Sequence, residues 1–146
     1  MIQPNGLLPS FEATSTGGQH ITSVAFRQRR NLLVAFFDDP EREALLEALT
    51  CERERLREAN AEVLVFLAYA QPATPELPFL TFADPGQHFW QRFGIPESAL
   101  VFTDQFGSIR KILWLPQAHP LPEAEEVLSW LEFIDLRCHE CNIPLW

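Results

Sequence analysis

The sequence predicts an α/β domain built on a mixed β-sheet, and three observations support this fold class. Two continuous apolar runs, 31–37 and 61–68, have the length and composition of strands that are buried on both faces. A helical pattern separates them, and a strand–helix–strand unit places its two strands parallel in one sheet. Further along, 99–103 and 108–114 form a predicted hairpin with its turn at 104–107.

The connecting segments carry helix signals. The first helix is expected at 40–59, because an aspartate, Pro40 and further acids form a typical helix start. Its apolar face is expected to consist of Leu45, Leu46, Leu49 and Leu56. A shorter helix is expected at 84–94, with Asp84 as its cap, Pro85 in its first turn and Gly94 as its stop.

The two ends of the chain complete the predicted domain. The first thirty residues, which contain Gly17 and Gly18, are expected to form a short hairpin and a loop. The last helix follows Pro122 and three acids, and its buried stripe is expected to be Val127, Leu131, Ile134 and then Cys138. The 146 residues suffice for one domain, 1–146, with a core that needs no disulfide or metal.

Composition excludes several classes of protein. The net charge of −9 disfavours nucleic acid as a partner, because phosphates would be repelled. No stretch approaches the roughly 20 apolar residues that span a bilayer, and the start lacks the features of a signal peptide. Three cysteines fit a reducing compartment, so we expect a cytoplasmic protein that contacts neither membrane nor nucleic acid.

Three segments, in this order, carry a resemblance to a known family. The first contains Gly6, Pro9, Phe11 and Gly18; the others are "PFLTFADPGQHFWQRFGI" and "LVFTDQFGSIRKIL". Together they resemble the redoxins, the peroxiredoxin family of alkyl hydroperoxide reductase and thiol-specific antioxidant (AhpC/TSA) proteins. The resemblance implies a thioredoxin-like fold, with a central mixed sheet flanked by helices and an N-terminal hairpin extension. It also implies an oxidoreductase or antioxidant role in cell redox homeostasis.

The chemistry of that family has no counterpart here. Redoxins carry their reactive thiol in the loop after the first central strand and in the helix that follows, where the helix N-terminus favours a thiolate. The corresponding stretch, "FFDDPEREALLEAL", has no cysteine, and its four acids would repel a thiolate. Cys51 lies more than a turn further on, towards the polar face, and is expected to be an exposed or half-exposed thiol without a role. Peroxidase activity of the family type is therefore not expected.

The pair Cys138 and Cys141, in "RCHEC", allows three interpretations. The two residues serve as small buried side chains that dock the tail, or as a redox-active or regulatory dithiol, or as half of a zinc site. A helix C-terminus raises a thiol pKa, which disfavours an attacking thiolate of the thioredoxin kind. Zinc needs four ligands, so the missing two would come from Cys51, His20, His88 or His119, or from a second copy of the chain.

Two hypotheses of function follow. In the first, the protein is a thiol–disulfide oxidoreductase or antioxidant relative whose remaining redox chemistry is carried by Cys138 and Cys141, with a thiol–disulfide partner protein. In the second, it is a catalytically degenerate thioredoxin-like module for binding or assembly. No cofactor is expected, a homodimer is allowed, and the same two cysteines are the fallback candidates for a metal.

Overall fold

The computed structural model describes residues 2–26, 29–74, 77–117 and 120–141, and from residue 137 onward it describes only the helical backbone. The strands are β1 (Glu12–Thr14), β2 (His20–Thr22), β3 (Asn31–Phe37), β4 (Ala61–Leu67), β5 (Leu80–Ala83), β6 (Ala99–Thr103) and β7 (Ile109–Trp114). The helices are η1 (Ser23–Ala25) and η2 (Pro40–Glu43), both 3₁₀, and α1 (Ala44–Thr50), α2 (Arg53–Glu58), α3 (His88–Phe93) and α4 (Ala124–Cys141).

Five strands form one mixed sheet in the order β5-β4-β3-β6-β7. The central pair β3 and β4 is parallel, with Asn31 opposite Ala61, whereas β6 runs antiparallel to β3 and to β7. The predicted parallel pair and the predicted hairpin in the same sheet are therefore both confirmed. The N-terminal hairpin is also confirmed, as the separate two-stranded sheet β1-β2.

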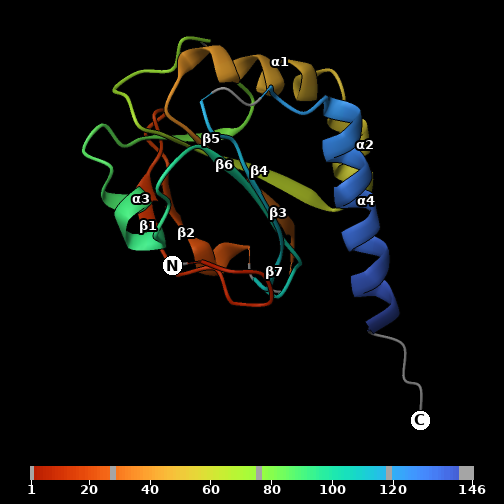
Figure 1. Ribbon diagram of the computed structural model, residues 1–146. Coiled ribbons are helices and arrows are strands. Elements are labelled where there is room, and N and C mark those ends of the chain that lie inside the picture. The colour runs from red at the N-terminus through yellow and green to blue at the C-terminus, as the bar shows by residue number, and fades with distance from the viewer. Residues whose placement is uncertain (1, 27–28, 75–76, 118–119, 142–146) are drawn as a thin grey trace.

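The sheet is the middle layer of the fold (Figure 1). One of its faces packs against α1, α2 and α4 through Phe37, Leu49 and Leu131, among others. The other face packs against the N-terminal segment and α3, where Phe11, Phe36, Phe66, Phe82 and Phe93 form a cluster of edge-on and stacked rings. Burial on both faces is why β3 and β4 read as continuous apolar runs, and the strand interior Leu33–Phe37 is fully shielded from solvent.

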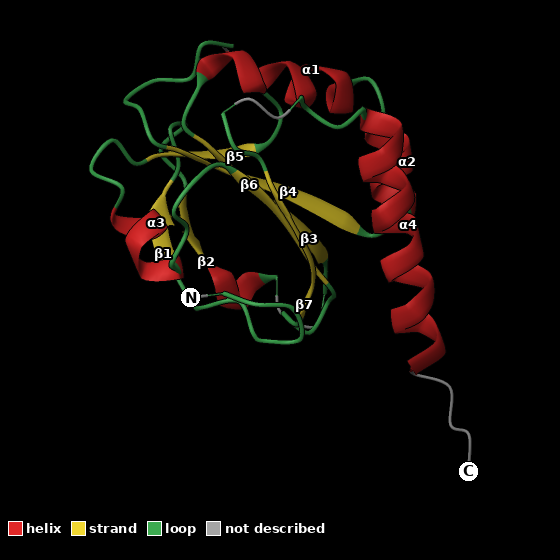
Figure 2. Ribbon diagram, viewed as in Figure 1, coloured by secondary structure: helices red, strands yellow, loops and turns green. Residues whose placement is uncertain are grey.

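The prediction of a single helix at 40–59 is wrong, because three short helices, η2, α1 and α2, occupy this stretch. Thr50 Oγ1 donates to the carbonyl of Leu46, and the next two amides bond to carbonyls three residues back, which tightens the last turn of α1. Glu52 then leaves the helical conformation, with φ −117° and ψ 30°. α2 consequently turns away from α1 and runs beside α4 (Figure 2), where the Arg55 guanidinium binds Glu125 and Glu132. The four leucines of the expected apolar face are nonetheless buried.

The helix expected at 84–94 begins later, at His88. Gln87 has a positive φ of 55°, so Pro85 and Gly86 form a turn instead of the first helical turn. Asp84 still caps the helix as predicted, because its carboxylate accepts from the backbone N–H groups of His88 and Phe89. Gly94 ends the helix in the left-handed conformation, with a φ of 72°.

β3 and β6 have the predicted bounds, and three other boundaries differ from the predicted ones by one or two residues. β4 ends at Leu67, β7 begins at Ile109, and α4 begins at Ala124. The predicted stripe of α4 is buried at Val127, Leu131 and Ile134, whereas the side chain of Cys138 lies outside the described part of the structure. No helix within the described residues is long and apolar enough to cross a membrane.

Candidate functional site

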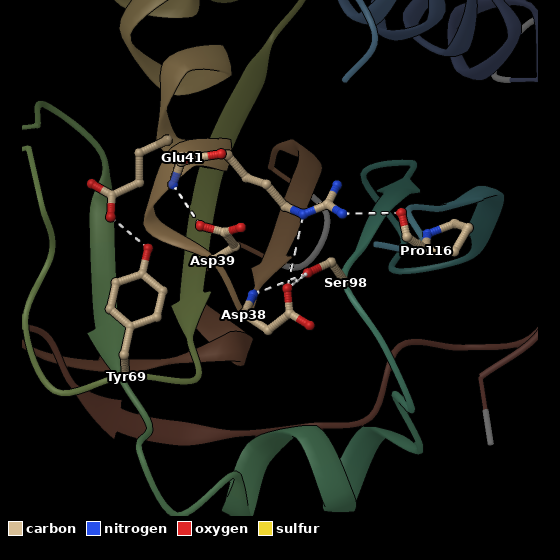
Figure 3. A network of polar contacts seen from close by, with 8 residues as sticks. Asp38, Asp39, Glu41, Tyr69, Ser98 and Pro116 are labelled. Atoms are coloured by element: carbon tan, nitrogen blue, oxygen red, sulfur yellow. Dashed lines mark hydrogen bonds and ion pairs between the residues drawn. The ribbon is translucent and has the colours of Figure 1, made fainter. Parts of the chain in front are cut away.

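The candidate site lies where β3 ends and η2 begins. The redoxins, which the sequence resembles, carry their reactive thiol at the corresponding place. The loop consists of Asp38 and Asp39, followed by η2 and α1. Figure 3 shows that the side chains at this point turn toward one another and toward the neighbouring loops. Residues 38–50 contain no cysteine, so the site consists of carboxylates, a hydroxyl, a phenol and a guanidinium.

Asp38 and Ser98 form the centre of the site. Ser98 Oγ accepts from the Asp38 backbone N–H at 3.0 Å and donates to Asp38 Oδ1 at 2.6 Å. Ser98 directly precedes β6, the strand that pairs with β3, and it is 1% exposed, whereas the Asp38 side chain is 44% exposed. The hydroxyl is thus fully engaged and buried, while one edge of the carboxylate remains in contact with solvent.

Arg42 lies behind this pair and is buried. Its guanidinium donates to the carbonyl oxygen of Pro116 at 3.0 Å, and its Nε lies 3.8 Å from Asp38 Oδ1. Arg42 therefore connects the loop after β3 to the loop after β7. A buried guanidinium needs such partners, because an unpaired buried charge is strongly destabilising.

Asp39 caps the first turn, since its Oδ1 accepts from the Glu41 backbone N–H at 3.0 Å. The chain then enters η2 with Pro40 in the first position and Glu41 exposed to solvent. The donors that could stabilise a thiolate at this helix start are thus partly occupied by a carboxylate of the chain itself.

Glu43 is the most deeply buried acid of the site, with 1% exposure. Its carboxylate accepts three hydrogen bonds, from Tyr69 Oη at 2.5 Å and from the backbone N–H groups of Ala73 and Thr74 at 2.9 Å each. These bonds hold the loop after β4 against η2, the short helix that ends with Glu43. Burial and the adjacent Glu43 carboxylate, together with Asp39 and Asp38, raise the pKa of Tyr69, so the phenol stays protonated and donates.

These hydrogen bonds and ion pairs therefore hold the loops in place, and none of the side chains that form them is a free nucleophile. Four acids and one arginine leave a negative balance, which would disfavour a thiolate or a peroxide anion. No group of three or more His, Cys, Asp or Glu residues within the described ranges is placed to hold a metal ion.

The structure does not bring the predicted site residues into this network. Cys51 is exposed, as predicted, and follows the far end of α1. Cys138 and Cys141 lie on the last turn of α4, and Figure 1 shows that this end of the helix points away from the start of the first helix. The side chains of both cysteines lie outside the described part of the structure, so their burial remains a prediction.

Arg42, Glu43, Tyr69 and Ser98 were missed as site residues from the sequence. One signal was available for the first two, because Arg42 and Glu43 lie three residues before Leu45 and Leu46 and so fall on the buried stripe. Charged residues at stripe positions indicate buried polar contacts rather than a solvated helix start. Tyr69 and Ser98 gave no local signal, because their partners are 26 and 60 residues away.

Comparisons with solved structures identify the fold. AhpC of Enterococcus faecalis superposes with a TM-score of 0.79 over 100% of both chains, at 17% identity. The reduced 2-Cys peroxiredoxin of Plasmodium vivax gives 0.75 over 98% of this chain and 88% of that one, at 15% identity. The chain has a peroxiredoxin-like thioredoxin fold.

Other thioredoxin-like proteins are structurally similar to this chain as well. A putative thioredoxin of Neisseria meningitidis gives a TM-score of 0.68 over 92% of this chain and 93% of that one, at 17% identity. No protein-family model matches the sequence, and the curated proteins contain no significant match. The likeness therefore lies in the fold, and the polar network described above is a property of this chain.

Proposed function

We propose that this protein is a catalytically degenerate redoxin that acts by binding a partner rather than by thiol chemistry at the end of β3. One observation carries the proposal: the groups at this position are bonded to one another, and none of them is a thiol. The Asp38–Ser98 pair and the Glu43–Tyr69 contact fix the loops around the helix start, which gives a rigid acidic surface. A partner protein with a basic surface fits this charge.

The test is a partner-capture experiment with variants that distinguish the effect of surface charge on binding from the effect of the thiols. Wild-type protein, a variant with all three cysteines replaced by serine, Glu41→Lys and Glu58→Lys are compared as baits. Glu41 is exposed beside the site, whereas Glu58 is exposed at the end of α2 and serves as the matched control. A partner retained by the cysteine-free and Glu58→Lys proteins but lost by Glu41→Lys supports the proposal. Capture that requires a cysteine contradicts it.

We propose a second candidate function for Cys138 and Cys141, which are three residues apart in the helical backbone of α4. Residues three apart on a helix have Cβ atoms about 5–6 Å apart, and a disulfide needs about 3.5–4.5 Å. Formation of a disulfide would therefore distort the last turn of α4 by bringing the two Cβ atoms closer together, and reduction would restore the regular helix. A slow regulatory dithiol of this kind would exchange with a thiol–disulfide partner protein, in keeping with the cytoplasmic location we propose.

This second proposal is tested by redox titration with mass mapping. A 138–141 disulfide that forms reversibly in glutathione buffers, and that Cys138→Ser abolishes, supports the dithiol. Stoichiometric zinc that is lost in Cys138→Ser and Cys141→Ser would instead support a metal site, completed by a second copy of the chain. Sedimentation of the zinc-loaded and zinc-free proteins would then show whether a homodimer forms with the metal.

A further inference from the structure

A cleft lies at the edge of the sheet, between the turn of the N-terminal hairpin and the segment that leads into β5. Its volume is about 620 Å³. Ser15, Thr16 and Gln19 line it from the hairpin, and Pro78 and Phe79 line it from the segment before β5. The cleft thus has a polar wall of hydroxyl and amide groups and an apolar wall, which is the composition of a small-molecule site.

The cleft follows from the unequal lengths of β4 and β5. Pairing between the two strands begins with Leu64 opposite Leu80, so the first residues of β4 extend past the beginning of β5. Thr16 donates its backbone N–H to the carbonyl of Thr81 at 2.8 Å, which holds the hairpin turn against β5. Glu62, the second residue of β4, lies at the place that β5 leaves open.

Glu62 is the single charged side chain among the described residues that line this cleft. It is partly buried, and within the described part of the chain no hydrogen bond or ion pair reaches its carboxylate. Burial raises its pKa, while the charge of Arg30 opposes that shift. Glu62, Pro78 and Phe79 also border a neighbouring hollow, whose other charged residues are Arg30, Arg53 and Arg57. Of these three, Arg30 acts on the pKa of Glu62, and its guanidinium lies 3.5 Å from Asn60 Oδ1. A partly desolvated carboxylate without a bonding partner therefore faces an amphipathic space.

We propose that this cleft binds an organic cation, namely a primary ammonium group joined to an apolar body. The ammonium group would donate to Glu62, and the apolar body would lie against Pro78 and Phe79. Charge-assisted bonds to a carboxylate are the stronger class of hydrogen bond, and they gain further from partial burial. The net charge of −9 also favours entry of a cation. This cleft lies beside β5, whereas the partner surface proposed above lies at the end of β3. The two are connected through the loop after β4, because Thr74 lines the cleft and donates its backbone N–H to Glu43.

The experiment titrates the protein with phenethylammonium and follows the backbone amide signals of Thr16, Gln19 and Thr81 by NMR. Saturable shifts at these amides are expected for the wild type. Glu62→Gln, which keeps the size of the side chain, should bind about tenfold more weakly, as should the uncharged analogue 2-phenylethanol with the wild type. Glu47→Gln, an exposed acid of α1 outside the cleft, should bind like the wild type.

A pH series provides a second readout. The affinity for phenethylammonium should fall as the pH is lowered and Glu62 is protonated. Because the pKa of Glu62 is raised above 4.5, this fall should begin at a higher pH than for an ordinary glutamate. Equal binding by wild type and Glu62→Gln, equal binding of the ammonium and the alcohol, or the absence of saturable shifts at these amides would each overturn the proposal.

Discussion

Asp38 and Ser98 hold each other by two hydrogen bonds across the ends of neighbouring strands. The Asp38 backbone N–H donates to Ser98 Oγ at 3.0 Å, and Ser98 Oγ donates in turn to Asp38 Oδ1 at 2.6 Å. Because Asp38 follows β3 and Ser98 precedes β6, the pair fixes the loop in which the redoxins, by resemblance, place their thiol. The pair provides no free nucleophile at this point, because the Ser98 hydroxyl already makes both hydrogen bonds.

Ser98→Ala should therefore lower the free energy of unfolding by about 1–3 kcal/mol, because it leaves a partly buried N–H and a carboxylate oxygen without their partner. Urea denaturation measures this change. Ser129→Ala is the matched control, because Ser129 is exposed on α4, and it should change stability by less than about 0.5 kcal/mol. Equal stability of the two variants would show that the Asp38–Ser98 pair does not hold the loop.

Glu43→Gln should loosen the loop after β4. The glutamine side chain has one oxygen where the carboxylate has two, so it cannot accept from Tyr69, Ala73 and Thr74 in the same way. Amide hydrogen exchange at Ala73 and Thr74 should accelerate, and stability should fall by about 1–3 kcal/mol. Glu47→Gln, on the exposed side of α1, should change neither quantity. Unchanged protection at both amides in Glu43→Gln would contradict this account.

Tyr69 is the one tyrosine of the chain, so its ionisation can be followed directly by tyrosinate absorbance. The unfolded phenol titrates near its ordinary pKa of 10.0, whereas burial and Glu43 raise the pKa in the folded state. The folded state thus keeps its proton longer, and the contribution of Tyr69 to stability is present below pH 10 and is lost as the pH rises above it.

Tyrosinate absorbance should accordingly stay flat through pH 10 in the folded protein and appear together with unfolding. The same titration in concentrated urea should give the ordinary pKa. Tyr69→Phe should lose the part of the pH dependence of stability that begins near this pH. Ionisation near pH 10 with an unchanged circular dichroism spectrum would rule out the buried contact with Glu43.

Cys51 should be the first thiol to react with an alkylating reagent, because it is exposed at the break between α1 and α2. Cys138 and Cys141 are predicted to react more slowly, since burial and a helix C-terminus both disfavour the thiolate. Mass mapping after brief treatment with iodoacetamide measures the order, and Cys51→Ser removes the fast product as a control. Faster modification of Cys138 or Cys141 would instead favour a redox role for that pair.

The sequence was informative where a pattern is local. β3 and β4 are buried on both faces, so their continuous apolar runs predicted both strands, and the helical pattern between them predicted their parallel pairing. The break at Cys51 and Glu52 gave no clear signal in the sequence, because every residue there is compatible with a helix. The contacts of Ser98 and Tyr69 were not predictable either, since each depends on a partner that only the fold brings close.

At the end of β3, this peroxiredoxin-like fold has carboxylates and no thiol, so we expect it not to reduce peroxide there. The most direct measurement mixes fully reduced protein with one equivalent of hydrogen peroxide and follows thiol oxidation by stopped flow and mass spectrometry, alongside a thioredoxin-coupled assay. We expect no fast phase, oxidation of all three thiols at the slow rate of free cysteine, and no coupled turnover. A fast phase and turnover that survive Cys138→Ser and Cys141→Ser but disappear in Cys51→Ser would contradict this expectation, because Cys51 would then reach the site.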